Sequence, residues 1–323
     1  MEKSSPTKRA LICGVGGQDG SYLARLLLAL GYKVFGTSRD ASTSGFGNLN
    51  RLGIRESVQL VSMAPNDFRS VLGVVDAAAP DEIYNLSGQS SVGLSFQQPV
   101  ETLESVLTAT VNILEAVRFL KRPVRFYNAC SAECFGNTGD LPANEETPFR
   151  PRSPYGVAKA AAFWQVANYR EAYGLFACSG ILFNHESPLR PERFVTAKIV
   201  NGARRIANGN PERLRLGNLD ISRDWGWAPE YVEAMYRMLQ IDTPRDFVIA
   251  TGRTHTLAEF AEAVFGEFGM DWRDHVEVDS NLMRPSDIAA NHADPRLAGS
   301  LLGWKAEVGL RELAGKLAAG DLF

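Results

Sequence analysis

The chain has 323 residues, enough for one large α/β domain or two unequal ones. Hydrophobic residues make up 45% and charged residues 22%, as is usual for a globular protein. The net charge of −3 argues against nucleic acid as a main partner. No apolar run reaches the roughly 18 to 20 residues that span a bilayer, so we expect no membrane contact. The N-terminus shows no signal-peptide pattern. The four cysteines lack CxxC spacing, so we expect them to be reduced in a cytoplasmic protein.

Short apolar runs predict six strands, at residues 10–13, 33–36, 58–61, 82–85, 124–127 and 177–182. The leucines from Leu23 to Leu30 follow i, i+3, i+4, i+7 spacing, which predicts a helix with one buried face. The same spacing from Leu107 to Val117 predicts a longer helix before the fifth strand. Alternation of strands and helices indicates parallel strands joined by right-handed crossovers. The sequence therefore predicts an α/β fold with a Rossmann-type, doubly wound parallel sheet.

The regular alternation fades beyond about residue 184. We therefore expect residues 1–183 to form the dinucleotide-binding domain. Residues 184–323 would form mainly a smaller α/β substrate-binding lobe packed on the sheet, with the chain able to cross between the two. Within this part, Thr256 and Glu259 have the spacing of a capping box. Asp294 and Pro295 predict a helix start, with Asp294 as N-cap and Pro295 at the first helical position.

A glycine-rich segment follows the first predicted strand directly. Gly14, Gly17 and Gly20 are spaced GxxGxxG and lead into the first predicted helix. Glycine allows the tight turn and the close approach of main chain to a pyrophosphate, which then lies at the positive end of a helix. The pattern alone is weak, but its position at the first strand–helix junction indicates a dinucleotide site.

The end of the second predicted strand carries two opposing signals about the cofactor. Ser38 and Arg39 favour the 2′-phosphate of NADP, whereas Asp40 favours the ribose hydroxyls of NAD. We predict NADP, with NAD as the alternative. A solvent-exposed loop arginine is the competing interpretation of Arg39.

Four residues suggest the chemistry. Tyr155 and Lys159 are four apart on a predicted helix and so share one face, which places an ammonium beside a phenol. A neighbouring cation favours the phenolate, so the pair is a plausible base near neutral pH. Ser131, just past a predicted strand, adds a hydroxyl that can hold a substrate oxygen. Glu133 is not needed for alcohol oxidation, and it suggests a second proton transfer beyond hydride exchange.

These residues and several longer strings resemble the GDP-mannose 4,6-dehydratases, within the extended branch of the short-chain dehydrogenase/reductase superfamily. The resemblance covers nearly the whole chain. The Asn-His-Glu-Ser string at 184–187 and the Arg-Asp-Trp-Gly string at 223–226 are more specific than any glycine loop. Further family strings lie at residues 14–20, 84–90, 151–156, 216–220, 231–235, 284–285 and 302–304.

The resemblance implies a lyase reaction with an internal redox cycle. Tyr155 would take the O4 proton while hydride leaves C4, Lys159 would lower the tyrosine pKa and hold the nicotinamide ribose, and Ser131 would bind O4. Glu133 would remove the C5 proton, water would leave from C6, and hydride would return to C6. An isolated Glu133 would otherwise be a surface or helix-start carboxylate.

The resemblance also implies the binding residues. Gln18 and Asp19 would join Gly14, Gly17, Gly20, Arg39, Tyr155 and Lys159 in holding the cofactor. Asn184, Lys198, Arg223 and Arg284 would contact GDP-mannose or a related GDP-sugar, and Arg and Lys suit a diphosphate. His185 is expected to be structural, and no metal is expected. Without the surrounding strings, the basic residues would be read as surface ion pairs.

Three departures from the family pattern keep alternatives open. Met63-Ala64 stand where Gly-Asp is usual, Arg39-Asp40 replace paired arginines, and Cys130 to Phe135 replace Ser-Thr-Ser-Glu-Leu-Tyr. The substrate could therefore be another GDP-hexose or a GDP-heptose.

Other classes of function also remain. The chain could be a GDP-4-keto-6-deoxysugar reductase or epimerase, which would not need Glu133, or a non-catalytic cofactor sensor. The superfamily resemblance suggests a homodimer through a four-helix contact of the Leu107 and Tyr155 helices, or a homotetramer.

Overall fold

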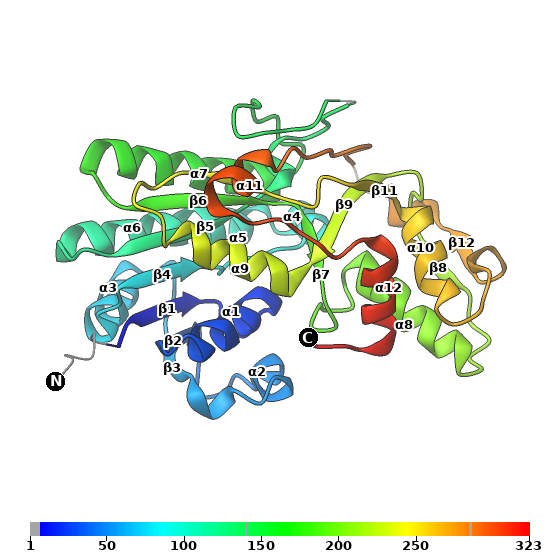
Figure 1. Cartoon of the computed structure of the whole chain (residues 1–323), viewed down its shortest axis with the longest axis horizontal. Helices are drawn as coiled ribbons and strands as arrows, with labels where there is room; N and C mark the ends of the chain where they lie inside the picture. The colour runs from blue at the N-terminus through cyan, green and yellow to red at the C-terminus, as the bar shows by residue number, and fades with distance from the viewer. Residues whose placement is uncertain (1–6, 140, 284–285) are drawn as a thin grey trace.

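A seven-stranded, fully parallel sheet forms the centre of the molecule, with the strand order β10-β6-β5-β4-β1-β2-β3 (Figure 1). The computed structural model describes residues 7–139, 141–283 and 286–323. The strands are β1 (Arg9–Cys13), β2 (Lys33–Ser38), β3 (Gln59–Ser62), β4 (Glu82–Asn85), β5 (Arg125–Ser131), β6 (Ala177–Leu182) and β10 (Phe247–Ile249). Strand order reverses beside β1, and such a switch point opens a ligand crevice at the carboxyl ends of the strands. The predicted doubly wound α/β class is confirmed.

Helices cover both faces of this sheet because its buried strands are apolar on both sides. Ile12 of β1 belongs to the core on one face, whereas its neighbour Leu11 belongs to the core on the other. The first face is covered by α1 (Gln18–Ala29), α2 (Gly47–Arg51), α9 (Ala228–Met238) and α11 (Arg296–Leu302). The second is covered by α3 (Phe68–Ala78), α6 (Ala109–Leu120) and α7 (Pro154–Tyr173).

The connection from β4 to β5 is built differently from the predicted single helix. It contains α4 (Val92–Gln97), α5 (Pro99–Leu103), a π-helical turn (Glu104–Thr108) and then α6. Leu107 therefore lies in the π-helical turn and not in the regular helix, which begins at Ala109. Such turns widen a helix locally and often lie beside functional sites. Here α5 packs against α7 and against the π-helical turn.

Most of the chain beyond residue 184 forms a second group of elements with its own core. Its strands are β7 (Asn184–Glu186), β8 (Leu214–Leu216), β9 (Ser222–Trp227), β11 (Thr254–Thr256) and β12 (Val276–Val278). Its helices are α8 (Val195–Ala207), α10 (Leu257–Gly266) and α12 (Leu310–Ala319), which gather at one end of the molecule (Figure 1). In contrast, α9 and β10 return to the large sheet. The chain thus passes between the two groups more than once.

Two helix-start predictions in this part have different outcomes. The capping box is confirmed, because the Thr256 side chain accepts from the Glu259 N–H while the Glu259 side chain accepts from the Thr256 N–H. The start at Asp294 is wrong by one residue: Pro295 is the N-cap and α11 begins at Arg296. The Asp294 carboxylate instead accepts from the Arg296 N–H and pairs with its guanidinium.

The four cysteines are free and buried. Among the described residues, no helix combines the length and apolar character that crossing a membrane requires.

Candidate active site

The glycine segment forms the tight turn between β1 and α1. Gly14 has a φ of +86°, and a Cβ there would lie 2.9 Å from the carbonyl oxygen of Leu86. A Cβ at Gly20 would lie 2.4 Å from the carbonyl oxygen of Gly14, closer than real atoms approach. Only glycine fits both positions without a shift of main chain. The turn leaves the N-terminus of the twelve-residue helix α1 facing the cavity beside it.

A cavity of about 720 Å³ lies against this turn. Six of the predicted cofactor residues line it: Gly14, Gly17, Gln18, Asp19, Gly20 and Arg39. A glycine cradle that a Cβ would fill, a helix N-terminus and a switch point of the sheet together fit a dinucleotide pyrophosphate. The described residues contain no group of three His, Cys, Asp or Glu side chains that could hold a metal ion.

Two of these residues also tie α1 to the second part of the chain. Gln18 Nε2 donates to the His185 carbonyl over 3.1 Å, and Gln18 Oε1 accepts from the Ser187 hydroxyl over 2.8 Å. Asp19 Oδ2 lies 2.9 Å from His185 Nε2. The turn after β1 is therefore fastened to β7 and to Ser187, the residue that follows it.

His185 has a hydrogen-bond acceptor at each ring nitrogen. Its Nδ1 lies 2.7 Å from the Phe183 carbonyl oxygen and its Nε2 faces Asp19. Burial lowers the pKa of His185, but the Asp19 carboxylate outweighs burial and raises the pKa above its usual value. The same pair lowers the Asp19 pKa to about 2 despite the opposing effect of burial. His185 stacks on Tyr231, with ring centroids 4.5 Å apart, which agrees with its expected structural role.

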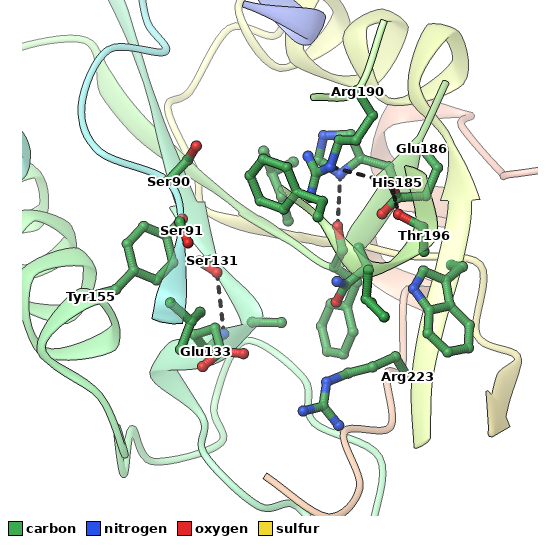
Figure 2. Close-up of a pocket in the computed structure, with 18 of the residues that line it drawn as sticks. Ser90, Ser91, Ser131, Glu133, Tyr155, His185, Glu186, Arg190, Thr196 and Arg223 are labelled. Atoms are coloured by element: carbon green, nitrogen blue, oxygen red, sulfur yellow. Dashed lines mark hydrogen bonds and ion pairs between the residues drawn. The ribbon is translucent and has the colours of Figure 1, made fainter. Parts of the chain in front are cut away.

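A second cavity, of about 410 Å³, adjoins the first, and Asp19 lines both. All four predicted catalytic residues line it: Ser131, Glu133, Tyr155 and Lys159. Strand β5 is longer than predicted and ends at Ser131. The Ser131 hydroxyl accepts a hydrogen bond from the Glu133 N–H over 3.3 Å. Ser131, Glu133 and Tyr155 lie together on one side of the cavity (Figure 2). The structure thus brings the four residues together.

The pKa effect expected of Lys159 is not found in this arrangement. Lys159 Nζ donates to the Ala129 carbonyl over 2.7 Å and lies 5.8 Å from the centroid of the Tyr155 ring. Burial raises the pKa of Tyr155 above its usual range, although a hydrogen bond with Ser131 opposes this. Burial likewise lowers the pKa of Lys159. Desolvation of the phenol therefore outweighs the neighbouring ammonium.

Three of the four predicted substrate residues line the same cavity: Asn184, Lys198 and Arg223. Arg223 is buried, donates to the Ile288 carbonyl over 2.8 Å and pairs with Asp287, and it lies across the cavity from Glu133 (Figure 2). Lys198 Nζ donates to the Arg215 carbonyl over 2.6 Å. Arg284 lies outside the described residues.

The unusual residues around Glu133 lie in the core behind the cavity, and two of them also reach its wall. Cys130, Ala132, Cys134 and Phe135 belong to one buried core cluster, and Cys130 and Ala132 also line the catalytic cavity. The sulfur atoms of Cys130 and Cys134 lie 3.5 Å apart. The departures at Cys130 and Ala132 therefore change the wall of the cavity itself.

The sequence analysis assigned no role to several residues at these cavities. Ser90 and Ser91, from the loop after β4, lie on the same side of the cavity as Tyr155 (Figure 2). Trp225 and Leu216 add apolar wall. Arg190, which pairs with Glu186, lines both cavities. Glu101 of α5 lines the larger one. Ser90 and Trp225 lie within family strings and could have been found there, but no local signal points to Glu101.

A doubly wound sheet, a glycine turn after β1, and Ser, Tyr and Lys in the adjoining cavity define a protein of the short-chain dehydrogenase/reductase class. Residues 11–317 match the family model described as GDP-mannose 4,6 dehydratase. The chain is 45% identical over 327 residues to GDP-mannose 4,6 dehydratase 2 of Arabidopsis thaliana, covering 98% of this chain and 87% of that protein. It therefore belongs to the GDP-mannose 4,6-dehydratase family.

Solved structures share the fold. UDP-glucose 4-epimerase of Thermus thermophilus, in complex with NAD, has a TM-score of 0.85 and 26% identity, covering 97% of this chain and 98% of that one. The protein RMD of Pseudomonas aeruginosa, complexed with NADPH, has a TM-score of 0.80 and 22% identity, covering 97% of each chain. The fold thus accommodates either nicotinamide dinucleotide in other proteins.

Proposed function

We propose that this chain is a hydro-lyase that converts GDP-mannose to GDP-4-keto-6-deoxymannose. The observation that carries the proposal is the position of Glu133, which lines one cavity with Ser131, Tyr155 and Lys159, next to the glycine turn. A carboxylate beside a Ser–Tyr–Lys set suits a second proton transfer in addition to alcohol oxidation. Membership of the family supports the same reaction.

Tyr155 and Ser131 would act on the 4-hydroxyl group of the sugar. A nicotinamide dinucleotide, when bound, supplies the hydride acceptor at C4 and the hydride donor at C6. The Tyr155 phenolate takes the proton of the 4-hydroxyl, and the Ser131 hydroxyl holds O4 beside it. The ammonium of Lys159 favours the phenolate electrostatically. Because burial raises the Tyr155 pKa, the phenolate is a strong proton acceptor once it forms.

Glu133 would carry out the elimination. Oxidation at C4 makes the neighbouring C5 proton acidic, and the Glu133 carboxylate removes it. The same carboxyl group then gives this proton to the C6 hydroxyl, which leaves as water. A single group can serve both steps because it is a base first and an acid second. Elimination leaves a C5–C6 double bond beside the 4-keto group. Return of the hydride to C6 and addition of a proton from water at C5 would then give the 4-keto-6-deoxy sugar.

The basic residues on the other side of the cavity would hold the diphosphate. Arg223 is fixed by Ile288 and Asp287, so its guanidinium is held in place before ligand arrives. Lys198 adds a second cation from α8, and Asn184 adds an amide. Charge-assisted bonds of this kind are strong and directional. A role for Arg284 stays a prediction.

The turn at Gly14, Gly17 and Gly20 would hold the pyrophosphate of the dinucleotide, with Gln18 and Asp19 fixing the start of α1. Arg39, Ser38 and Ser44 line the same cavity and support the predicted NADP. Glu101, which pairs with Arg39, opposes it. Asn66 also lines this cavity, close to the Met63-Ala64 departure, and offers an amide to the adenine.

The proposal is tested by incubating the purified protein with GDP-mannose and either dinucleotide. Mass spectrometry should find a product lighter than the substrate by one water molecule. Glu133→Gln should abolish that product, whereas Glu146→Gln, an exposed carboxylate that does not line the cavity, should leave it unchanged. Full activity of Glu133→Gln would remove the proposed role of this residue.

The departures at Cys130 and Ala132 favour a second candidate, a dehydratase acting on another GDP-hexose or a GDP-heptose. The same assay with a panel of GDP-sugars separates the two, because the true substrate loses water fastest. Reduction or epimerisation without loss of water would instead point to the reductase or epimerase alternative. A protein that binds cofactor but changes no sugar would be the sensor.

We also propose that the protein is a homodimer through α5, α6 and α7. Val157 and Trp164 lie seven residues apart on α7, hence on one face, and are 47% and 62% exposed. Val100, Leu103 and Phe119 add exposed apolar side chains from α5 and α6. Light scattering should give a dimeric mass, and Trp164→Glu should lower it. A tetrameric mass would require a second interface, and a monomeric wild type would contradict the proposal.

The cytoplasmic location stays a prediction.

A further inference from the structure

An ion pair lies at the β2 end of the larger cavity, which we assign to the cofactor. Arg39 follows the last residue of β2, and its Nη1 lies 3.8 Å from Oε1 of Glu101, which comes from α5. Both residues line the cavity, with 82% and 49% of their side chains exposed. The end of the second strand is where a doubly wound fold distinguishes the ribose hydroxyls of NAD from the 2′-phosphate of NADP. Glu101 therefore places a negative charge at that position.

Asp40, the acidic residue that the sequence offers for this position, is turned away. Its carboxylate accepts from the main-chain N–H groups and the hydroxyls of Ser42 and Thr43. These hydrogen bonds lower the Asp40 pKa to about 2. Asp40 does not line the cavity. Among the residues that do line its β2 end, Glu101 is the acidic one.

The groups that would attract a 2′-phosphate already have partners. Arg39 pairs with Glu101, and the Ser38 and Ser44 hydroxyls lie 2.8 Å from one another. Arg190 and Arg193 also line this cavity, but they line the catalytic cavity too and so mark its other end.

A phosphate monoester carries about −1.5 to −2 charges at neutral pH, so a carboxylate beside it is unfavourable. A ribose hydroxyl, in contrast, can donate a hydrogen bond to a carboxylate. We propose that Glu101 is a specificity-determining residue that discriminates against the 2′-phosphate, so that this chain binds NAD more tightly than NADP. The inference rests on the proposed function only in assigning the larger cavity to a nicotinamide dinucleotide.

Binding to the cofactor-free protein tests the inference without turnover. Titration calorimetry at low ionic strength gives the Kd of NAD and of NADP, and the pair 5′-AMP and 2′,5′-ADP isolates the 2′-phosphate. Wild type should bind NAD more tightly. Glu101→Gln should lower the Kd of NADP about five- to tenfold, because it removes a negative charge beside the 2′-phosphate. It should raise the Kd of NAD by no more than about threefold. The gain in NADP affinity should shrink in high salt, since Arg39 and Glu101 are exposed and their charges are screened.

Glu104→Gln is the matched control, because Glu104 is an exposed carboxylate that does not line the cavity and lies three residues after Glu101, at the start of the π-helical turn. It should change the ratio of the two Kd values by less than twofold. In the Glu101→Gln background, Arg39→Gln should remove the gain in NADP affinity, since Arg39 would then hold the phosphate.

An unchanged ratio in Glu101→Gln, an equal shift in Glu104→Gln, or a wild type that prefers NADP would overturn the inference. Its failure is distinguishable from failure of the proposed function. If the protein dehydrates GDP-mannose but Glu101→Gln leaves the ratio of the two Kd values unchanged, the inference about Glu101 is wrong and the proposed function stands. A shift in the Kd ratio without dehydration removes the dehydratase assignment alone.

Discussion

The two adjoining cavities are built in different ways. The larger one is shaped at its centre by main chain, where Gly14 and Gly20 let the turn after β1 fold back on itself. The smaller one is shaped by side chains brought from β5, α7, β7, α8 and β9. Main-chain geometry tolerates few substitutions, because a single Cβ displaces the turn. A wall made of side chains can change one residue at a time, as at Cys130 and Ala132, while the fold stays the same.

The largest effect is expected from filling the glycine turn. In Gly20→Ala the new Cβ would lie 2.4 Å from the Gly14 carbonyl oxygen and 2.7 Å from Val15 Cα, so main chain must move. We expect dinucleotide affinity to fall about 100-fold or more, and stability to fall by about 1–3 kcal/mol, as for other overpacked positions. Calorimetry and urea unfolding measure the two effects.

Gly47→Ala is the control for this change, because Gly47 lines the same cavity but has no atom within 4 Å of an added Cβ. It should bind as wild type does. Normal binding by Gly20→Ala would mean that the turn does not cradle the dinucleotide.

A change in the side-chain cavity should instead separate catalysis from binding. Tyr155→Phe removes one hydroxyl from a buried ring and leaves the turn after β1 intact. We expect kcat to fall about 10²- to 10⁴-fold, the usual contribution of a positioned acid or base, while the Kd of the dinucleotide changes less than about threefold.

Tyr173→Phe, an exposed tyrosine at the end of the same helix, should keep wild-type activity. If Tyr155→Phe retained more than half of the activity, another group would have to accept the O4 proton. If it lost cofactor and activity together, the distinction between the two cavities would fail.

The His185–Asp19 pair joins the two cavities and gives a pH-dependent contribution to stability. Because the His185 pKa is raised in the folded protein, this contribution is fully present below the unfolded value of about 6.5 and is lost as the pH rises through the higher folded value. The free energy of unfolding of wild type, relative to His185→Gln, should therefore decrease from pH 6 to pH 9. Urea titrations at several pH values measure it.

Asp19→Asn tests the cause, because it keeps the shape of the side chain and removes the charge. Without the Asp19 carboxylate, burial and the charge of Arg190 should lower the pKa of His185, so the decline above pH 6.5 should disappear. A decline that persists in both variants would come from other groups.

The sequence predicted the sheet well because each buried strand carries its own local signal. The strands at 82–85 and 177–182 have the predicted bounds, and the glycine spacing marks the turn after β1. The prediction ended the fifth strand at 127, although it continues to Ser131 through the small residues Ala129 and Cys130, which look like the start of a loop. Local pattern was sufficient wherever neighbours in sequence are neighbours in space.

The remaining site features depend on contacts between distant segments. Glu101 of α5 reaches Arg39 after the end of β2, although the two residues are 62 positions apart in the chain. Asp40 resembled a ribose ligand, yet neighbouring Ser42 and Thr43 capture its carboxylate. Burial, which the sequence does not show, raises the pKa of Tyr155 despite the neighbouring Lys159. Such effects follow from tertiary packing.

The smallest effect is expected far from both cavities. Thr256→Ala removes the N-cap of α10, whose apolar face belongs to the core of the second group of elements and not to the sheet. Loss of an N-cap costs about 1 kcal/mol of stability. The Kd of either dinucleotide should stay within twofold of wild type, because the turn after β1 is untouched. Glu262→Ala, an exposed mid-helix change in α10, should alter stability by less than about 0.5 kcal/mol.

A single unfolding transition that shifts as a whole in Thr256→Ala would indicate that the two groups of elements unfold together, as the return of α9 and β10 to the sheet favours. An early transition confined to the variant would instead show that the second group can open while the cofactor cavity stays folded.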